Sequence, residues 1–282
     1  MKITKCVIPA AGFGTRFLPA TKSQPKEMLP IVDKPCIQYL AEEAVASGIK
    51  EIIIVTGSSK RSIEDFFDFS FELDAHLRKH KRTAALKELE RIERMAKFIY
   101  VRQPFPKGDG HAILCAKEIV ANEPFAVLFG DDIWDAKVPP LKQMMKVFEK
   151  EQAPVISLEK IPKKDTDKYG IAGLDGMQVT SLVEKPKPSK APSTFALTGK
   201  YIVTPELLKD LEKAGSGHKD GEIRLIDGMK RYIKHSPIFG AEIKGQRFDT
   251  GDKLGYLKAV VHFALKHKEL SKDFKKFLKS QV

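Results

Sequence analysis

The first side chains that could do chemistry lie near the N-terminus, and most of them are cationic. Gly12 and Gly14 follow a short apolar segment, and Arg16, Lys22 and Lys26 come soon after them. Glycine reaches positive φ at low cost and lets backbone N–H groups approach a ligand closely, so several donors can converge on one anion. The guanidinium and the two ammonium groups would supply the countercharge. This spacing predicts an anion-binding loop for phosphate oxygens.

Two well-known phosphate-binding motifs do not match this loop. The dinucleotide fingerprint has a third glycine where this chain has Phe17, and a P-loop ends in Gly-Lys followed by Ser or Thr, a sequence that this loop does not contain. From the glycines alone, a turn without a ligand is as good an interpretation as a phosphate site. The neighbouring Thr15-Arg16 and Pro25-Lys26-Glu27 favour the phosphate site.

Carboxylates form the second candidate group. Asp131 and Asp132 follow the apolar run 125–129 and the single residue Gly130. Mg²⁺ on substrate phosphates commonly takes one or two protein carboxylates and fills its other positions with water and phosphate oxygens. Asp131 is therefore our first candidate for a Mg²⁺ ligand. A turn-capping role remains the alternative, because aspartate after a strand often caps a turn.

Two further groups could bind the organic parts of a substrate. Glu184 and Lys185 place an acceptor for sugar hydroxyls beside an ammonium for a phosphate, although an exposed pair of opposite charges is the commoner explanation of such a dipeptide. Gln103 carries an amide that can both donate to and accept from a pyrimidine edge, and Gly108 leaves room for a ring. Together with the loop, these residues favour a sugar phosphate and a nucleotide as ligands.

The run from Gly12 to Pro35 resembles the signature of the sugar-1-phosphate nucleotidylyltransferases, which carry Gly-x-Gly-Thr-Arg, Pro-Lys and Leu-Pro. Lys26-Glu-Met-Leu-Pro30 followed by Ile31-Val-Asp-Lys-Pro35 is most similar to the bacterial members that make UDP-glucose from UTP and glucose 1-phosphate. The resemblance extends from Ile8 to about His267. It implies UTP and glucose 1-phosphate as substrates, Mg²⁺ as cofactor, and a homo-oligomer, either a dimer or a tetramer.

The resemblance also implies a role for each matching residue. The catalytic residues would be Arg16, Lys26 and Asp131. The metal ligands would be Asp131 and Asp249. The nucleotide would contact Ala10, Ala11, Gly12, Gly14, Thr15, Arg16, Lys26, Glu27, Gln103 and Gly108. The sugar phosphate would contact Asp132, Gly170, Glu184, Lys185 and Gly199.

Three positions depart from the family pattern. Asp109 replaces a leucine beside the nucleotide pocket, Thr250 replaces a cysteine common in close relatives, and Arg224 replaces a glutamine. His111 could act as a base, but an ionised phosphate oxygen can attack without one. We therefore expect His111 to have a helix-start or packing role.

Two other functions remain as alternatives. A thymidylyltransferase or another sugar-1-phosphate nucleotidylyltransferase would differ in its base and sugar pockets. A non-catalytic sugar-nucleotide sensor would be expected to have lost Arg16, Lys26 or Asp131, and all three are present.

Composition limits the class of protein. The 282 residues are 42% hydrophobic and carry a net charge of +12, much of it in segments 78–97 and 266–279, where Lys and Arg alternate with acids and leucine. Such segments are typical of solvated amphipathic helices, and because the sequence shows no helix-turn-helix or RNA-binding signature they do not favour nucleic acid. No apolar run approaches the roughly 20 residues of a membrane span. The scattered Cys6, Cys36 and Cys115 predict reduced thiols and a cytoplasmic protein.

The predicted helices and strands that position these residues indicate an α/β fold. Apolar runs at 51–56, 98–101 and 125–129 alternate with helical patterns, which predicts a doubly wound, Rossmann-like, mostly parallel mixed sheet flanked by helices. Ligands then bind beyond the carboxyl ends of the strands. We expect one domain over 1–282: a nucleotide-binding half at about 1–158, a smaller sugar-binding β/α half at about 159–265, and a basic C-terminal helix at about 266–282. Helices are expected at 112–120, 206–213, 222–233 and 252–267.

Overall fold

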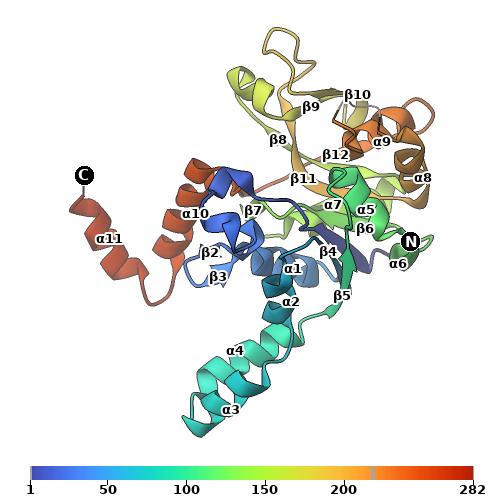
Figure 1. Cartoon of the computed structure of the whole chain (residues 1–282). Helices are drawn as coiled ribbons and strands as arrows, with labels where there is room; N and C mark the ends of the chain where they lie inside the picture. Colours follow the sequence, from blue (N-terminus) through green and yellow to red (C-terminus); the bar gives the residue numbers. More distant parts are fainter. Residues whose placement is uncertain (1, 217–219, 282) are drawn as a thin grey trace.

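The computed structural model describes residues 2–216 and 220–281, arranged around one large twisted sheet (Figure 1). Its nine strands lie in the order β5-β4-β1-β6-β11-β8-β12-β10-β9. In that order their bounds are Lys97–Arg102, Glu51–Thr56, Lys5–Pro9, Phe125–Leu128, Phe195–Val203, Val155–Lys160, Phe239–Glu242, Gln178–Glu184 and Gly170–Asp175. The mixed α/β fold predicted from the sequence is confirmed.

The strands of this large sheet that precede residue 129 pair with one another in parallel. β1 pairs in parallel with β4 and with β6, and β4 pairs in parallel with β5. Successive side chains of β4 enter opposite cores: Ile53 and Val55 belong to one hydrophobic cluster, and Ile52 and Ile54 to the other. A continuous β-branched run is thus explained by burial on both faces.

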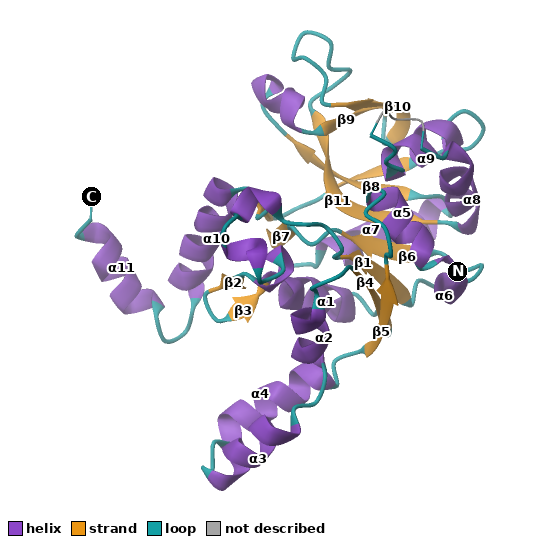
Figure 2. Ribbon diagram, in the orientation of Figure 1, coloured by secondary structure: helices purple, strands orange, loops and turns teal. Residues whose placement is uncertain are grey.

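Helices cover both faces of the sheet (Figure 2). One face packs against α5, α6, α8 and α9, with bounds Asp109–Cys115, Lys117–Val120, Pro205–Ala214 and Leu225–Tyr232. The other face packs against α1, α2 and α7, with bounds Cys36–Ala46, Arg61–Phe67 and Pro140–Glu151. The expected helix 112–120 is therefore two short helices that meet at Ala116.

The second half of the chain extends the sheet mainly with antiparallel pairs. β11 pairs antiparallel with β6 and β8, and β10 pairs antiparallel with β9 and β12. Two small sheets stand apart from it: β7 with β13, and β2 with β3, with bounds Asp132–Asp135, Gln246–Asp249, Pro30–Ile31 and Lys34–Pro35. The short helices η1 to η4 span Thr15–Phe17, Ala20–Lys22, Lys26–Met28 and Lys163–Lys168.

The charged segments form helices that project from the body (Figure 1). The segment 78–97 contributes to a hairpin of α3 (Phe71–Lys79) and α4 (Thr83–Glu93) before it enters β5, and the C-terminal segment ends in α11 (Ser271–Lys279), after α10 (Lys253–Lys266). In the described part of the chain, no helix is both long and apolar enough to cross a bilayer.

Candidate active site

The glycine-rich loop leaves the carboxyl end of β1 and is fixed by its own side chains. Gly14 has φ +66, a left-handed conformation that favours glycine, and its carbonyl oxygen accepts a hydrogen bond of 2.7 Å from Thr21 Oγ1. A Cβ on Gly14 would approach Lys26 Cβ to 3.2 Å, whereas Gly12 faces open space. The loop is thus held close to Lys26 while its Gly12 backbone stays accessible.

A cleft of about 350 Å³ opens over this loop. Eight of the residues assigned to the nucleotide line it: Ala11, Gly12, Gly14, Thr15, Lys26, Glu27, Gln103 and Gly108. Asp109 and Glu222 complete part of the wall. Ala10 is buried beneath the loop and its N–H donates to Val55 O, so its contact with the nucleotide stays a prediction.

Lys26 and Asp131 meet at the edge of this cleft. Lys26 Nζ lies 2.7 Å from Asp131 Oδ2, and the two side chains are 24% and 30% exposed. Burial alone would lower the pKa of Lys26, but the charges of Asp131 and Glu27 outweigh it and raise that pKa. Burial acts on Asp131 in the opposite sense, and Lys26 overcomes it and holds the pKa of Asp131 low. Both groups are therefore charged at neutral pH.

Asp249, the last residue of β13, lies close to the pair of Lys26 and Asp131 at the turn that follows this strand. A Cβ on Gly251 would lie 2.8 Å from Asp131 Oδ2, 3.0 Å from Asp249 Oδ1 and 3.3 Å from Arg16 Nη1, so these three groups converge on one point. Arg16 Nη1 also donates to Gly251 O, and Thr250 N donates to Asp131 O. Two carboxylates and a guanidinium from three distant segments thus share one small volume.

The two carboxylates fit a hard divalent cation. Burial raises the pKa of Asp249, and the charges of Asp132 and Asp131 raise it further, while Arg247 lowers it. Carboxylates that repel one another in this way are stabilised by an added cation, and oxygen donors suit Mg²⁺. Among the described residues, no cluster of three or more His, Cys, Asp and Glu side chains is arranged for a metal. Phosphate oxygens and water would therefore supply the remaining positions.

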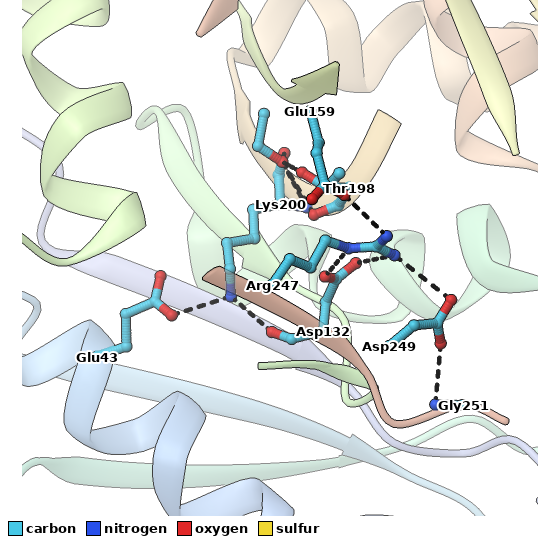
Figure 3. Close-up of polar contacts among 9 residues, drawn as sticks. Glu43, Asp132, Glu159, Thr198, Lys200, Arg247, Asp249 and Gly251 are labelled. Atoms are coloured by element: carbon cyan, nitrogen blue, oxygen red, sulfur yellow. Dashed lines mark hydrogen bonds and ion pairs between the residues drawn. The ribbon is translucent and has the colours of Figure 1, made fainter. Parts of the chain in front are cut away.

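Arg247 organises the carboxylates behind the cleft, and the sequence analysis missed it. Its side chain is 7% exposed, and its Nε lies 2.6 Å from Asp132 Oδ1 (Figure 3). The same guanidinium reaches Glu159 Oε2 at 3.2 Å and Asp249 Oδ2 at 3.5 Å, and stacks 5.1 Å from the Tyr169 ring. These neighbours raise the pKa of Arg247 against the effect of burial. Its place two residues before Asp249, on the same face of β13, is the signal that could have revealed it.

Hydrogen bonds fix the segment 103–111, which contains the residues predicted to contact the base. Gln103 Nε2 donates to Gly108 O at 3.0 Å and lies 2.9 Å from His111 Nδ1. Burial and the charge of Lys107 lower the pKa of His111, which leaves the ring neutral and its Nδ1 free to accept. His111 therefore orients the amide of Gln103 so that Gln103 Oε1 is left for a ligand.

Asp109, in the wall of the cleft, ties this loop to the second half of the chain. Its Oδ1 accepts from Gly110 N at 2.7 Å and from Leu225 N at 3.1 Å, at the start of α9. Ile223 pairs with the same loop, donating to Lys107 O and accepting from Gly110 N. Residues 222–224, expected to begin a helix, are extended for this reason, and α9 begins only at Leu225.

Of the residues assigned to the sugar, Gly170 lies beside Glu184 and Gly199 lies beside Asp132. A Cβ on Gly170 would lie 3.2 Å from Glu184 Oε2, and one on Gly199 would lie 2.5 Å from Asp132 Oδ2. Lys185 is exposed, and its N–H donates to Tyr169 O. Both carboxylate oxygens of Asp132 are already held by Arg247, so the contact of Asp132 with a sugar phosphate stays a prediction.

A second missed residue, Lys60, supports Glu27. Lys60 Nζ lies 3.0 Å from Glu27 Oε2, and their side chains are only 7% and 1% exposed. Glu27 Cγ packs on Gly130, where a Cβ would come within 2.9 Å, and Glu27 Oε1 is buried without a hydrogen-bond partner among the residues that the structure describes. A buried carboxylate oxygen of this kind is costly unless a ligand group completes it. The position of Lys60, directly before α2 and after the carboxyl end of β4, is the only feature of the sequence that hints at this role.

Comparisons with known proteins find relatives that match nearly the whole chain. A family model described as nucleotidyl transferase matches residues 5–264. The UTP–glucose-1-phosphate uridylyltransferase of Bacillus subtilis (strain 168) is 45% identical over 284 residues, covering 98% of this chain and 96% of the relative. A UTP-bound UGPase from Acinetobacter baumannii is 40% identical with a TM-score of 0.90, over 98% of this chain and 99% of that one. A UDP-glucose pyrophosphorylase complexed with UDP-glucose is 40% identical with a TM-score of 0.84, over 94% and 100%.

Proposed function

This chain belongs to the nucleotidyl transferase family, and we propose that it transfers UMP from UTP to glucose 1-phosphate, giving UDP-glucose and pyrophosphate. The observation that carries this proposal is the 2.7 Å pair of Lys26 and Asp131 at the edge of the glycine-lined cleft. The pair places one cation and one potential metal ligand beside the loop that would hold the phosphates. The similarity to proteins named for UTP and UDP-glucose supports the choice of base and sugar.

The reaction is a direct in-line displacement. An oxygen of glucose 1-phosphate attacks the α-phosphorus of UTP, the bond from that phosphorus to the bridging oxygen breaks, and pyrophosphate leaves with the electron pair. The attacking oxygen is already ionised at neutral pH, so no protein base is needed. Catalysis then consists of positioning and charge stabilisation.

Each charged residue of the site has a task in this displacement. Lys26 and Arg16 neutralise charge on the α-phosphate and on the departing pyrophosphate, and Lys185 orients the attacking phosphate. Asp131 and Asp249 are the residues that would hold Mg²⁺, which when bound supplies further positive charge to the phosphate oxygens. Backbone N–H groups of Gly12 and Gly14 would bind the phosphates.

The remaining assignments concern the organic groups. Gln103 and Gly108 would contact uracil, with Gln103 Oε1 presented by the hydrogen bonds to Gly108 and His111. Glu184 would bind sugar hydroxyls, with backbone at Gly170 and Gly199 on the same side. Glu27, with its unpartnered Oε1, would accept a hydrogen bond from the nucleotide.

Three further features of the protein remain part of the proposal. We place it in the cytoplasm, because its three cysteines are free thiols, of which Cys6 and Cys36 are buried. We expect a homodimer or homotetramer, with the projecting helices α3, α4 and α11 as candidate contacts. UDP-glucose made there would serve polysaccharide synthesis.

Pyrophosphate release tests the proposal. Purified protein is incubated with Mg²⁺ and glucose 1-phosphate and with UTP, dTTP, ATP, CTP or GTP in turn. We expect strong preference for UTP, and loss of release in Asp131→Ala and Lys26→Ala. Preference for dTTP would leave the mechanism intact and change the substrate, whereas no release with any nucleotide would indicate a sugar-nucleotide sensor.

A further inference from the structure

Lys200 in β11 has a fully buried ammonium group behind the turn that carries Asp131. Its side chain is 0% exposed, and its Nζ donates to Asp132 O at 3.0 Å and lies 3.0 Å from Glu43 Oε2 (Figure 3). Lysine is almost never buried to this extent unless it is paired. A buried charge of this kind is stable only with good geometry and complete hydrogen bonding, so its position is tightly fixed.

An irregularity in β11 brings Lys200 to this place. The register of β11 against β8 shifts between Leu197 and Tyr201, and Gly199 has φ +57. Ser157 Oγ, on β8, bonds to Thr198 O and Lys200 O and accepts from Lys200 N, which replaces the ladder bonds lost in the bulge. Bulges commonly re-aim a side chain near a functional site. Here the bulge directs Lys200 toward Glu43 and the carbonyl of Asp132.

Glu43 connects Lys200 to two helices. It lies on α1, and its Oε1 accepts a hydrogen bond of 3.1 Å from Leu141 N in the first turn of α7. Its side chain is 9% exposed. The ammonium of Lys200 is therefore fixed by α1, α7 and β11 together.

The Asp131–Asp132 turn is held from two sides. Thr250 N donates to Asp131 O at 2.8 Å on one side, and Lys200 Nζ donates to Asp132 O on the other. Phe129 N also donates to Gly199 O, next to Lys200 in the chain. Two successive carbonyl oxygens are thus anchored, and the direction of the Asp131 carboxylate follows from them.

We propose that Lys200, held by Glu43, is a positioning residue that fixes the Asp131–Asp132 turn for binding of Mg²⁺ and the α-phosphate. It does not touch the substrate. The inference rests on the proposed function for its kinetic consequences, but its structural consequence can be measured without substrate. Supporting groups behind metal ligands commonly change affinity or activity by about 10–100-fold when removed.

Three variants and one control test this role. Lys200→Met removes the charge and the donor at similar length, Lys200→Arg restores a donor, and Glu43→Gln removes the counter-charge but keeps an acceptor for Leu141 N. The control is Asp210→Asn. Asp210 is a 6% exposed residue on α8 that is paired with Arg231 and His235, so this change also removes a buried charge, but on another element.

Trp134 provides a readout without substrate. It is the single tryptophan in the sequence, lies in β7 two residues after Asp132, and is 8% exposed. In Lys200→Met we expect a red-shifted emission and stronger quenching by acrylamide, together with a kcat lower by about 10–100-fold and a higher half-saturating Mg²⁺ concentration. The KM for UTP should change little. Lys200→Arg should recover part of the loss, and Asp210→Asn should lower only the thermal midpoint.

A purely structural role predicts a different pattern. If Lys200→Met loses thermal stability as Asp210→Asn does, yet keeps the emission of Trp134, kcat and the Mg²⁺ requirement, the proposal is wrong. If Lys200→Met does not fold, the same measurements on Glu43→Gln decide it. If the wild-type protein makes no UDP-glucose, the proposed function fails, and the emission of Trp134 in the ligand-free variants still decides the role of Lys200.

Discussion

Lys26 and Asp131 each compensate the other's charge in a half-buried place, so neither can be removed without changing its partner. Arg247 does the same for Asp132 and Asp249. Truncating one member of such a pair leaves an uncompensated charge. The free energy of folding that is lost is then larger than the net contribution of the ion pair. A single substitution here should therefore change how well the charge of the substrate is neutralised. It should also shift the pKa of the remaining partner.

We predict that Lys26→Ala lowers kcat/KM by roughly 10²–10³-fold, because it removes a preorganised cation from the reacting phosphate. Lys26 also holds the pKa of Asp131 low, so in the variant that pKa rises and the acid limb of the pH–rate profile moves to higher pH. Steady-state kinetics across pH measures both effects. Lys34→Ala, which removes an ammonium paired with Glu42, is the control. An unmoved acid limb in Lys26→Ala would refute the electrostatic coupling.

Asp109 gives a second prediction with a defined sign. Burial raises the pKa of the Asp109 carboxyl above its ordinary value, so from about pH 4 upward the unfolded chain loses this proton before the folded one does. The stability that protonated Asp109 contributes is present below the unfolded pKa and is lost as the pH rises through the folded pKa. Asp109→Asn keeps an oxygen for Gly110 N and Leu225 N without the charge. Its stability relative to wild type should therefore increase with pH through that window.

Urea midpoints at several pH values measure this difference. Asp109→Leu, which removes the acceptor for both N–H groups, should be less stable than wild type at every pH tested. An Asp109→Asn stability difference that is independent of pH would show that burial of the charge is not the cause.

At the scale of elements, the site depends on loops that meet from both halves of the chain. The loop 107–110 is paired with Ile223 by backbone hydrogen bonds in both directions, and Asp109 adds a third link to α9. Loops positioned in this way recognise ligands because a rigid partner defines their shape. We therefore expect the proposed contacts of Gln103 and Gly108 with the base to depend on the backbone pairing of Ile223.

We predict that Ile223→Pro raises the KM for UTP by about 10-fold, because proline lacks the N–H that Ile223 donates to Lys107 O. The kcat at saturating UTP should fall less. Ile223→Val, which keeps the N–H, serves as the control. Equal KM values in the two variants would mean that the pairing does not shape the nucleotide loop.

The elements were predictable where local signals were strong. β4 matches the β-branched run at 51–56, β5 includes the predicted run at 98–101, and α10 begins after Asp252, whose side chain caps it. The predicted start of α9 at residue 222 was wrong, because the segment 222–224 forms long-range hydrogen bonds that override its helical pattern. The bulge in β11 and the β7–β13 pair were not predicted either, since both depend on partners distant in the sequence. For the same reason Arg247, Lys60 and Lys200 were missed, while residues of the glycine loop carried a local pattern.

At the scale of the whole molecule, charge limits stability at low pH. Glu42, Asp131 and Asp135 have lowered pKa values: burial acts against each shift, and Arg91, Lys26 and Lys266, respectively, are the chief cations that outweigh it. Each of these carboxylates contributes stability that is present above its pKa in the unfolded chain. That stability is lost as the pH falls through its pKa in the folded protein. Protonation also increases a net charge that is already +12 at pH 7.

We therefore predict that the thermal midpoint falls steeply below about pH 4. Added salt should restore part of it, because salt screens the self-repulsion of exposed charges but not the half-buried pairs. Scanning calorimetry at low and high salt separates the two contributions. A midpoint that stays constant from neutral pH to about pH 3 would contradict the assignment of these carboxylates.

A direct displacement at the α-phosphorus of UTP inverts the configuration at that phosphorus, which can be measured. The protein is incubated with glucose 1-phosphate, Mg²⁺ and each diastereomer of UTP carrying sulfur on the α-phosphorus. From the accepted diastereomer, we expect thio-UDP-glucose with inverted configuration. Retention would indicate a covalent enzyme intermediate and contradict the mechanism, and no UDP-glucose from unmodified UTP would contradict the function.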